Sequence, residues 1–194
     1  LVGAFVFTIV MKLQQTYKKK YNIIEFYKAS MLLAKAITLL IRNNKNKIID
    51  KLFIQRIHLA VTEVNGCPVC SYEHTKMALK KGMSNEEISS FLSGKQNFIQ
   101  PQEAKAIAFA QHYADARGIP KLYTYKSIIK EYGTEKAEII LAAIQIMMVG
   151  NMYGLPFSAF KSRFKGKVYS DSTLGYEISM LLLGGLLLPI AILH

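Results

Sequence analysis

The side chains best suited to chemistry are Cys67 and Cys70, which form a Cys-x-x-Cys motif, and His74, four residues further on. The motif follows Asn65-Gly66, a pair that ends a helix, and Pro68 suits the first turn of the next helix. Near a helix start, free amide groups and the positive end of the helix dipole favour thiolate over thiol. Their spacing puts all three side chains on one helical face, where the cysteines can close a disulfide and the histidine can exchange a proton.

Other interpretations of this motif remain open at the level of the residues. The cysteines and the histidine can simply pack in a core. A structural zinc site normally takes four ligands, so His58 or His112 would have to join Cys67, Cys70 and His74. Thioredoxin-like chemistry places the motif after a β-strand, and no strand is predicted before it. We therefore favour a dithiol peroxidase on a helical scaffold, with no metal and no bound cofactor.

The segments around the motif predict an all-α fold. No segment alternates apolar and polar residues over the length of a strand, and no strand-turn-strand signal occurs. A polar stretch over 43–46 predicts a loop, and Ser84 with Glu87 predicts a capping box. Helical patterns are predicted over about 22–42, 47–64, 67–80, 84–93, 101–117, 121–132 and 134–153.

The composition describes one globular domain. A chain of 194 residues is long enough for a core, and 51% apolar with 20% charged residues excludes disorder. The formal charge of +12 attracts anions, but the lysines are scattered along helical segments, so we predict no nucleic-acid partner. Two cysteines cannot form the disulfide framework of a small secreted protein, which favours a reducing, cytoplasmic compartment.

Both ends of the chain are apolar. Residues 1–10 precede the first lysines, the reverse of the order in a secretory signal, so we predict no signal peptide. Residues 174–193 carry only Glu177 as a charge and have about the length of a membrane helix. Gly184-Gly185, Pro189 and Glu177 favour burial between subunits, and membrane contact is the alternative. The predicted organisation is an apolar then basic leader over 1–20, a helical domain over 21–173 and a C-terminal apolar helix over 174–194.

Around the motif the chain reads Val64-Asn65-Gly66-Cys67-Pro68-Val69-Cys70-Ser71-Tyr72-Glu73-His74, followed by Gly82. This segment resembles the signature of the carboxymuconolactone decarboxylase superfamily, in its alkyl hydroperoxidase D-like branch. The resemblance covers 51–83 best and extends over a core of 47–153. It implies a compact helical fold assembled as a trimer or hexamer. It also implies an enzyme that reduces organic hydroperoxides or re-reduces a peroxiredoxin-type partner, using a thiol reductant.

The resemblance also implies roles for individual residues. Cys70 is the sulfur that peroxide oxidises to a sulfenic acid, Cys67 is the proton donor and disulfide partner, and His74 belongs to a proton relay. The family places a glutamate twelve residues before the first cysteine, where this chain has Gln55. Glutamine can hold a hydrogen bond but cannot take up a proton, so the relay is either weakened or completed by another carboxylate. Glu63, at the end of the preceding helix, is the nearest candidate, and His58, one turn from Gln55, is the alternative.

Two other functions compete with a thiol peroxidase. The decarboxylase branch of the same superfamily is a lyase that does not depend on a Cys-x-x-Cys pair, so the pair argues against it. A non-enzymatic membrane-associated protein would use the apolar segment 174–193 together with the positive charge of the chain.

Overall fold

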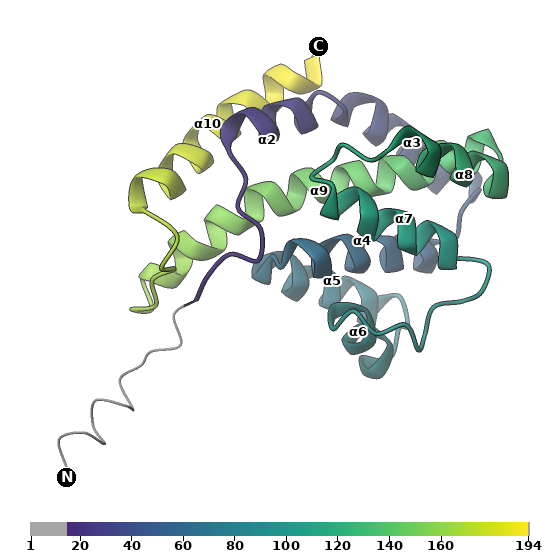
Figure 1. Ribbon diagram of the computed structural model, residues 1–194, viewed down its shortest axis with the longest axis horizontal. Coiled ribbons are helices and arrows are strands. Elements are labelled where there is room, and N and C mark those ends of the chain that lie inside the picture. The colour runs from purple at the N-terminus through teal and green to yellow at the C-terminus, as the bar shows by residue number, and fades with distance from the viewer. Residues whose placement is uncertain (1–14, 194) are drawn as a thin grey trace, which may run out of the picture.

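The computed structural model describes residues 15–193, and Figure 1 shows how their helices are arranged. Within this range the chain is all-α, and its one β-type pairing is an isolated bridge between Gln15 and Tyr169. The apolar leader predicted at 1–10 lies outside the described residues. The helices are α2 (Ile23–Ser30), α3 (Leu33–Asn46), α4 (Lys51–Asn65), α5 (Pro68–Lys80), α6 (Asn85–Leu92), α7 (Ala104–Asp115), α8 (Leu122–Tyr132), α9 (Thr134–Arg163) and α10 (Leu174–Leu193).

Helix α9 is the axis of the fold. It runs through the middle of the molecule and packs against α2, α3, α4, α5, α7, α8 and α10. Its alanine, isoleucine and methionine side chains are buried around much of its circumference, as expected of a central helix. Helix α4 is the second core helix, because it packs against α5, α6, α7 and α9. Ile57 and Leu59 of α4 are fully buried there, as is Ile144 of α9.

The junction between α4 and α5 follows the local signals in the sequence. Helix α4 ends at Gly66, whose φ of +67° lies in the left-handed region that favours glycine. A β-carbon at Gly66 would also lie 2.5 Å from Cβ of Lys18, so the N-terminal segment crosses closely at this point. Cys67 then occupies the N-cap of α5 and Pro68 its first turn. The predicted helix stop and restart are confirmed.

The prediction of one helix over 22–42 followed by a loop over 43–46 is wrong. The chain forms α2 and α3 with a break at Met31-Leu32, where the amide of Leu32 bonds back only three residues, to Ala29. The hydroxyl of Ser30 donates to the carbonyl of Phe26, a back-bond that often bends helices. Helix α3 then continues through the polar stretch, because the buried Asn43 side chain bonds both backbone groups of Ile49.

Two further predictions need correction. The helix predicted to end near residue 153 continues to Arg163, although Pro156 removes one amide donor from its interior. Leu155 and Ala159, on either side of Pro156, are buried, so tertiary packing holds this extension in place. Only half of the predicted capping box forms as described: Ser84 accepts from the amide of Glu87, whereas the Glu87 carboxylate accepts from Arg56.

In the part of the chain that the structure describes, two helices, α9 and α10, are long and apolar enough to cross a membrane by length and composition alone. The apolar window of α9 is 72% buried inside the fold, which makes it a core helix, whereas that of α10 is 22% buried. Helix α10 packs one stripe against α9 and α2 and leaves Leu182, Leu186 and Leu193 exposed. Its one charge, Glu177, is buried and accepts two hydrogen bonds from Arg163. Coverage of this helix by a second subunit stays a prediction.

Candidate redox site

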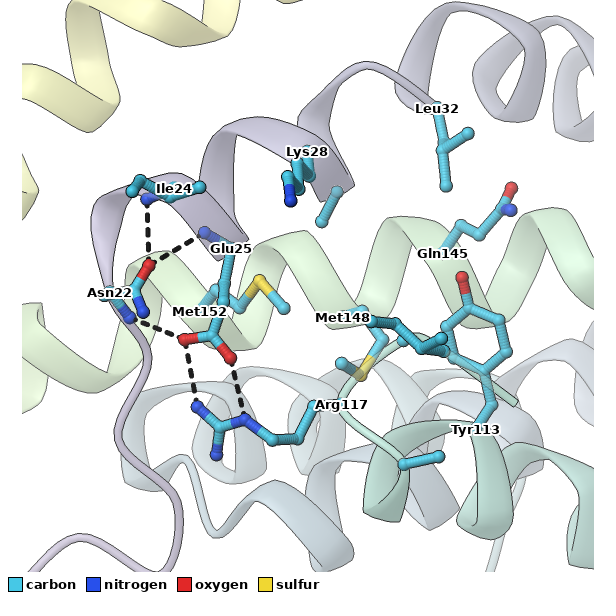
Figure 2. Close-up of a pocket in the computed structure, with 14 residues that line it drawn as sticks. Asn22, Ile24, Glu25, Lys28, Leu32, Tyr113, Arg117, Gln145, Met148 and Met152 are labelled. Atoms are coloured by element: carbon cyan, nitrogen blue, oxygen red, sulfur yellow. Dashed lines mark hydrogen bonds and ion pairs between the residues drawn. The ribbon is translucent and has the colours of Figure 1, made fainter. Parts of the chain in front are cut away.

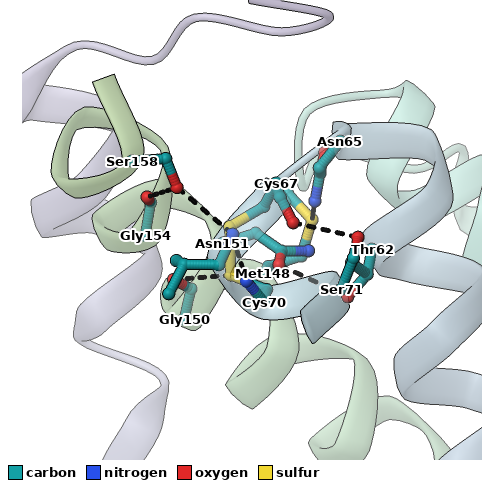
Figure 3. Close-up of a disulfide and its surroundings, with 11 residues drawn as sticks. Thr62, Asn65, Cys67, Cys70, Ser71, Met148, Gly150, Asn151, Gly154 and Ser158 are labelled. Carbon is teal, nitrogen blue, oxygen red and sulfur yellow. Dashed lines mark hydrogen bonds between the residues drawn. A yellow bond between two sulfur atoms is a disulfide. The ribbon is translucent and has the colours of Figure 1, made fainter. Parts of the chain in front are cut away.

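Cys67 and Cys70 are joined by a disulfide across the first turn of α5, with their Cα atoms 5.3 Å apart (Figure 3). Cys67 is fully buried, whereas Cys70 retains 7% of its surface and lines a cavity between α5 and α9. A dissolved reactant therefore reaches the sulfur of Cys70 and not that of Cys67.

The cavity beside Cys70, called the redox cavity below, has a volume of about 330 Å³. Glu73, His74 and Tyr153 are its charged or titratable members besides Cys70, and the others are apolar side chains and glycines. Such a lining suits an apolar substrate that carries one polar reacting group. The lining residues are Val69, Cys70, Glu73, His74, Met147, Gly150, Tyr153, Gly154 and Phe157.

Helix α9 touches the disulfide at Gly154. A β-carbon at this position would lie 2.6 Å from Sγ of Cys70 and 2.7 Å from Sγ of Cys67, distances that no real side chain reaches. One turn later, the hydroxyl of Ser158 accepts from the amide of Val69 at 3.2 Å and donates to the carbonyl of Gly154 at 2.8 Å. These contacts fasten the start of α5 to α9 (Figure 3).

The role of Gly154 was not predicted from the sequence. An isolated glycine inside an otherwise apolar helix often has a packing reason, and Gly150 and Gly154 repeat at one helical turn. Only Gly154 has such a reason, because a β-carbon at Gly150 would meet nothing closer than Cε of Met147 at 3.9 Å. The signal was present, but it could not reveal that the partner is the disulfide.

The two sulfurs occupy different electrostatic positions. Cys67 is the N-cap of α5, and its Sγ accepts from the amide of Cys70 at 3.4 Å. A negative charge on Cys67 is therefore stabilised by an amide and by the positive end of the α5 dipole. Sγ of Cys70 lies 3.7 Å from the carbonyl oxygen of Gly150 on α9. Cys67 is thus the better leaving thiolate and Cys70 the better exposed target.

The structure brings Gln55 and His74 together, the two residues that the family resemblance places in one relay. Nε2 of the buried Gln55 side chain lies 3.0 Å from Nδ1 of His74 and donates to the His74 carbonyl oxygen at 3.1 Å. On its other side, Oε1 of Gln55 accepts from Nζ of Lys81 at 2.9 Å. Lys81, which follows α5 directly, was not among the site residues predicted from the sequence.

His58 packs its ring edge-on against the ring of His74, with centroids 5.0 Å apart. Burial, with a smaller contribution from Lys81, lowers the pKa of His74 to about 4, and burial, with smaller contributions from His74 and Lys81, lowers the pKa of His58 to about 3. Both rings are therefore neutral at pH 7. Both nitrogens of His58 are buried and have no hydrogen-bond partner among residues 15–193, so His58 makes no relay contact there.

Glu63 lies in a different part of the surface, at the far end of α4. Its carboxylate pairs with Nζ of Lys18 at 2.6 Å, and Lys18 also donates to the Glu63 carbonyl oxygen at 2.7 Å. Within residues 15–193, Glu63 makes no hydrogen bond or ion pair with His74 or either cysteine. The structure therefore separates Glu63 from the other four predicted site residues.

Two further features of the described part of the chain bear on the alternatives. In residues 15–193, no group of three or more His, Cys, Asp or Glu side chains is arranged to hold a metal ion.

Another pocket, of about 460 Å³, lies between α2, α7 and α9 and is shown in Figure 2. Met148 and Met152 line it, and Arg117 donates two hydrogen bonds to Glu25 across it. It contains neither cysteine nor histidine, so the redox cavity is the better candidate site.

Residues 25–112 match the model of a family described as the carboxymuconolactone decarboxylase family. The match runs from within α2 to within α7, so it includes the disulfide, Gln55 and His74 but not the wall that α9 contributes. No curated protein and no solved structure matches the chain.

Proposed function

We propose that this protein is a thiol-dependent peroxidase of the alkyl hydroperoxidase D-like type, because residues 25–112 match the model of the carboxymuconolactone decarboxylase family. The observation that carries the proposal is the Cys67–Cys70 disulfide, with Cys70 facing an apolar cavity beside His74. The proposed substrate is an organic hydroperoxide. The proposed electron donor is a small thiol or a peroxiredoxin-type protein.

In the oxidising half of the cycle, the Cys70 thiolate attacks the terminal oxygen of the hydroperoxide. The O–O bond breaks, Cys70 becomes a sulfenic acid, and the alkoxide leaves as an alcohol after taking the proton of the Cys67 thiol. The Cys67 thiolate then attacks the sulfur of Cys70, which forms the disulfide and releases hydroxide, protonated to water by solvent. The sulfur has supplied two electrons, and the structure corresponds to this oxidised state.

In the reducing half, a donor thiolate attacks the accessible sulfur of Cys70. The S–S bond breaks and Cys67 leaves as a thiolate, stabilised by its N-cap position on α5. A second donor thiol then releases Cys70 as the donor disulfide. The different exposure of the two sulfurs supports Cys70 as the reacting sulfur in both halves.

The experiment is a thiol titration of the reduced protein before and after an equimolar dose of cumene hydroperoxide. We expect both cysteine thiols to be lost and mass spectrometry to find a two-proton loss in the peptide that contains them. Cys70→Ser should abolish cumene hydroperoxide reduction. Cys67→Ser should instead accumulate a sulfenic acid on Cys70 that dimedone traps.

Persistence of both free thiols under peroxide would overturn the peroxidase and leave the lyase branch of the family as the better hypothesis. Dimedone labelling of Cys67 in Cys70→Ser, without labelling of Cys70 in Cys67→Ser, would keep the peroxidase but reverse the two roles.

A further inference from the structure

The Lys81–Gln55–His74 chain of hydrogen bonds has only one assignment of donors and acceptors. A lysine ammonium group can only donate, so the oxygen of Gln55 must face Lys81. A backbone carbonyl can only accept, so the nitrogen of Gln55 must face the His74 carbonyl. Both constraints place Nε2 of Gln55 against Nδ1 of His74, where the amide nitrogen can only donate. Nδ1 of His74 is therefore an acceptor and carries no hydrogen.

We infer that Gln55, held by Lys81, fixes His74 as the tautomer protonated on Nε2, so that His74 presents a hydrogen-bond donor to the redox cavity rather than a base. His74 lines this cavity together with Cys70, and Nδ1 is already occupied by Gln55. Gln55 and Lys81 are positioning residues in this arrangement, because they act through the ring. The catalytic consequence rests on the proposed peroxidase, whereas the tautomer does not.

A glutamate at position 55 would reverse the direction of these hydrogen bonds. A carboxylate can only accept, so it would take the hydrogen of Nδ1 and leave Nε2 of His74 as a bare acceptor, able to act as a base. It would also favour the charged ring, since a carboxylate beside a histidine raises its pKa. The Gln55–Lys81 pair does the opposite on both counts, because it donates to the ring and places a positive charge nearby.

This arrangement defines what His74 can do in the proposed cycle. A neutral imidazole does not release its Nε2 hydrogen near pH 7, so His74 transfers no proton. Its N–H can stabilise negative charge on the Cys70 thiolate or on the departing alkoxide oxygen, as donors fixed in an apolar cavity do well. The proton that the alkoxide requires still comes from the Cys67 thiol.

The first test is a direct observation of the tautomer. Long-range ¹H–¹⁵N correlation spectra of the ¹⁵N-labelled full chain at pH 7 distinguish a protonated Nε2 from a protonated Nδ1, with His74→Gln assigning the signal. We expect Nε2–H in the wild type and Nδ1–H in Gln55→Glu. Lys81→Met removes one of the two constraints on Gln55 and should weaken the preference for Nε2–H, whereas Lys81→Arg, which keeps a donor, should preserve it. Glu63→Gln, on the same helix but outside the hydrogen-bonded chain, is the matched control and should leave the spectrum unchanged.

A wild-type spectrum with Nδ1–H, or an unchanged tautomer in Gln55→Glu, would overturn the inference. If the tautomer is as expected but cumene hydroperoxide is not reduced, the proposed function fails and the positioning role stands.

The second readout is the pH profile of cumene hydroperoxide reduction. His74 stays neutral down to its pKa of about 4, so its titration should leave no limb between pH 5 and 8 in the wild type. Gln55→Glu should add a limb in that range by raising the pKa of His74. A mutation that only damaged the fold would lower the rate at every pH. The other titratable groups beside His74 or its cavity are His58, Cys70, Glu73, Lys81 and Tyr153.

Discussion

Helix α4 carries a polar side chain near each of its ends, Gln55 and Glu63, and the two lie in different environments. At one end, Gln55 is buried and all its hydrogen-bonding groups are engaged by Lys81 and His74. At the other end, Glu63 shares a surface pocket with Lys18 and Asp115, where the side chain of Lys18 is 53% exposed and that of Asp115 78%. Water screens charges at the second end, whereas the first is shielded from it. Residue type alone therefore did not identify the group that controls His74.

The largest expected effect comes from filling the contact between α9 and the disulfide. Gly154→Ala would place a β-carbon 2.6 Å from Sγ of Cys70, and the linked sulfurs cannot move apart to accept it. We expect the free energy of unfolding to fall by roughly 3 kcal/mol, at the upper end of the range for overpacking. Urea unfolding of the oxidised protein measures the change.

Gly150→Ala is the matched control, one helical turn away on α9. The added β-carbon meets only Cε of Met147, at 3.9 Å. Replacing this helical glycine should therefore raise the free energy of unfolding by about 0.5–1 kcal/mol. Equal stabilities for the two variants would show that the α5–α9 contact is looser than the structure indicates.

The second largest effect is expected from acid, which should lower the free energy of unfolding through the buried histidines His58 and His74. The pKa values of His58 and His74 are lowered in the folded protein, to about 3 and about 4, so the unfolded chain binds protons first as the pH falls. Their contribution to stability is complete above the ordinary histidine pKa of about 6.5 and is lost as the pH falls through that value towards 4.

His58→Leu tests this contribution, because it removes a titrating ring with two unpaired buried nitrogens. Between pH 7 and pH 5, thermal unfolding should show this variant losing about 1–2 kcal/mol less stability than the wild type. The same acid sensitivity in both proteins would mean that His58 is hydrated or paired in solution.

The smallest effect is expected at the exposed end of α4. Glu63→Gln breaks a partly exposed ion pair with Lys18, which is typically worth about 0–1 kcal/mol, so denaturant unfolding should change little. Cumene hydroperoxide reduction should keep its wild-type rate. A fall of about 10²- to 10⁴-fold would restore Glu63 as a general base and would contradict the separation seen here.

The sequence by itself determined the elements that carry the chemistry. Glycine at the end of α4, cysteine at the N-cap and proline in the first turn of α5 act through bonds within about one helical turn, so local pattern sufficed to place Cys67, Cys70 and His74. The all-α fold class also followed from local sequence patterns. Position 55 came from a family resemblance, and its hydrogen bond to His74 was then found in the structure.

Tertiary structure decided what those residues touch. The contact of Gly150 with Cys70 joins residues 80 apart in the chain, and the bond from Lys81 to Gln55 joins residues 26 apart. Such contacts depend on how helices pack, as do the break between α2 and α3 and the continuation of α9 beyond Pro156. The pairing of Glu63 with Lys18 also depends on tertiary packing. Proximity to a cysteine along the chain says nothing about which face of α4 meets α5, and that face is set by burial of the core.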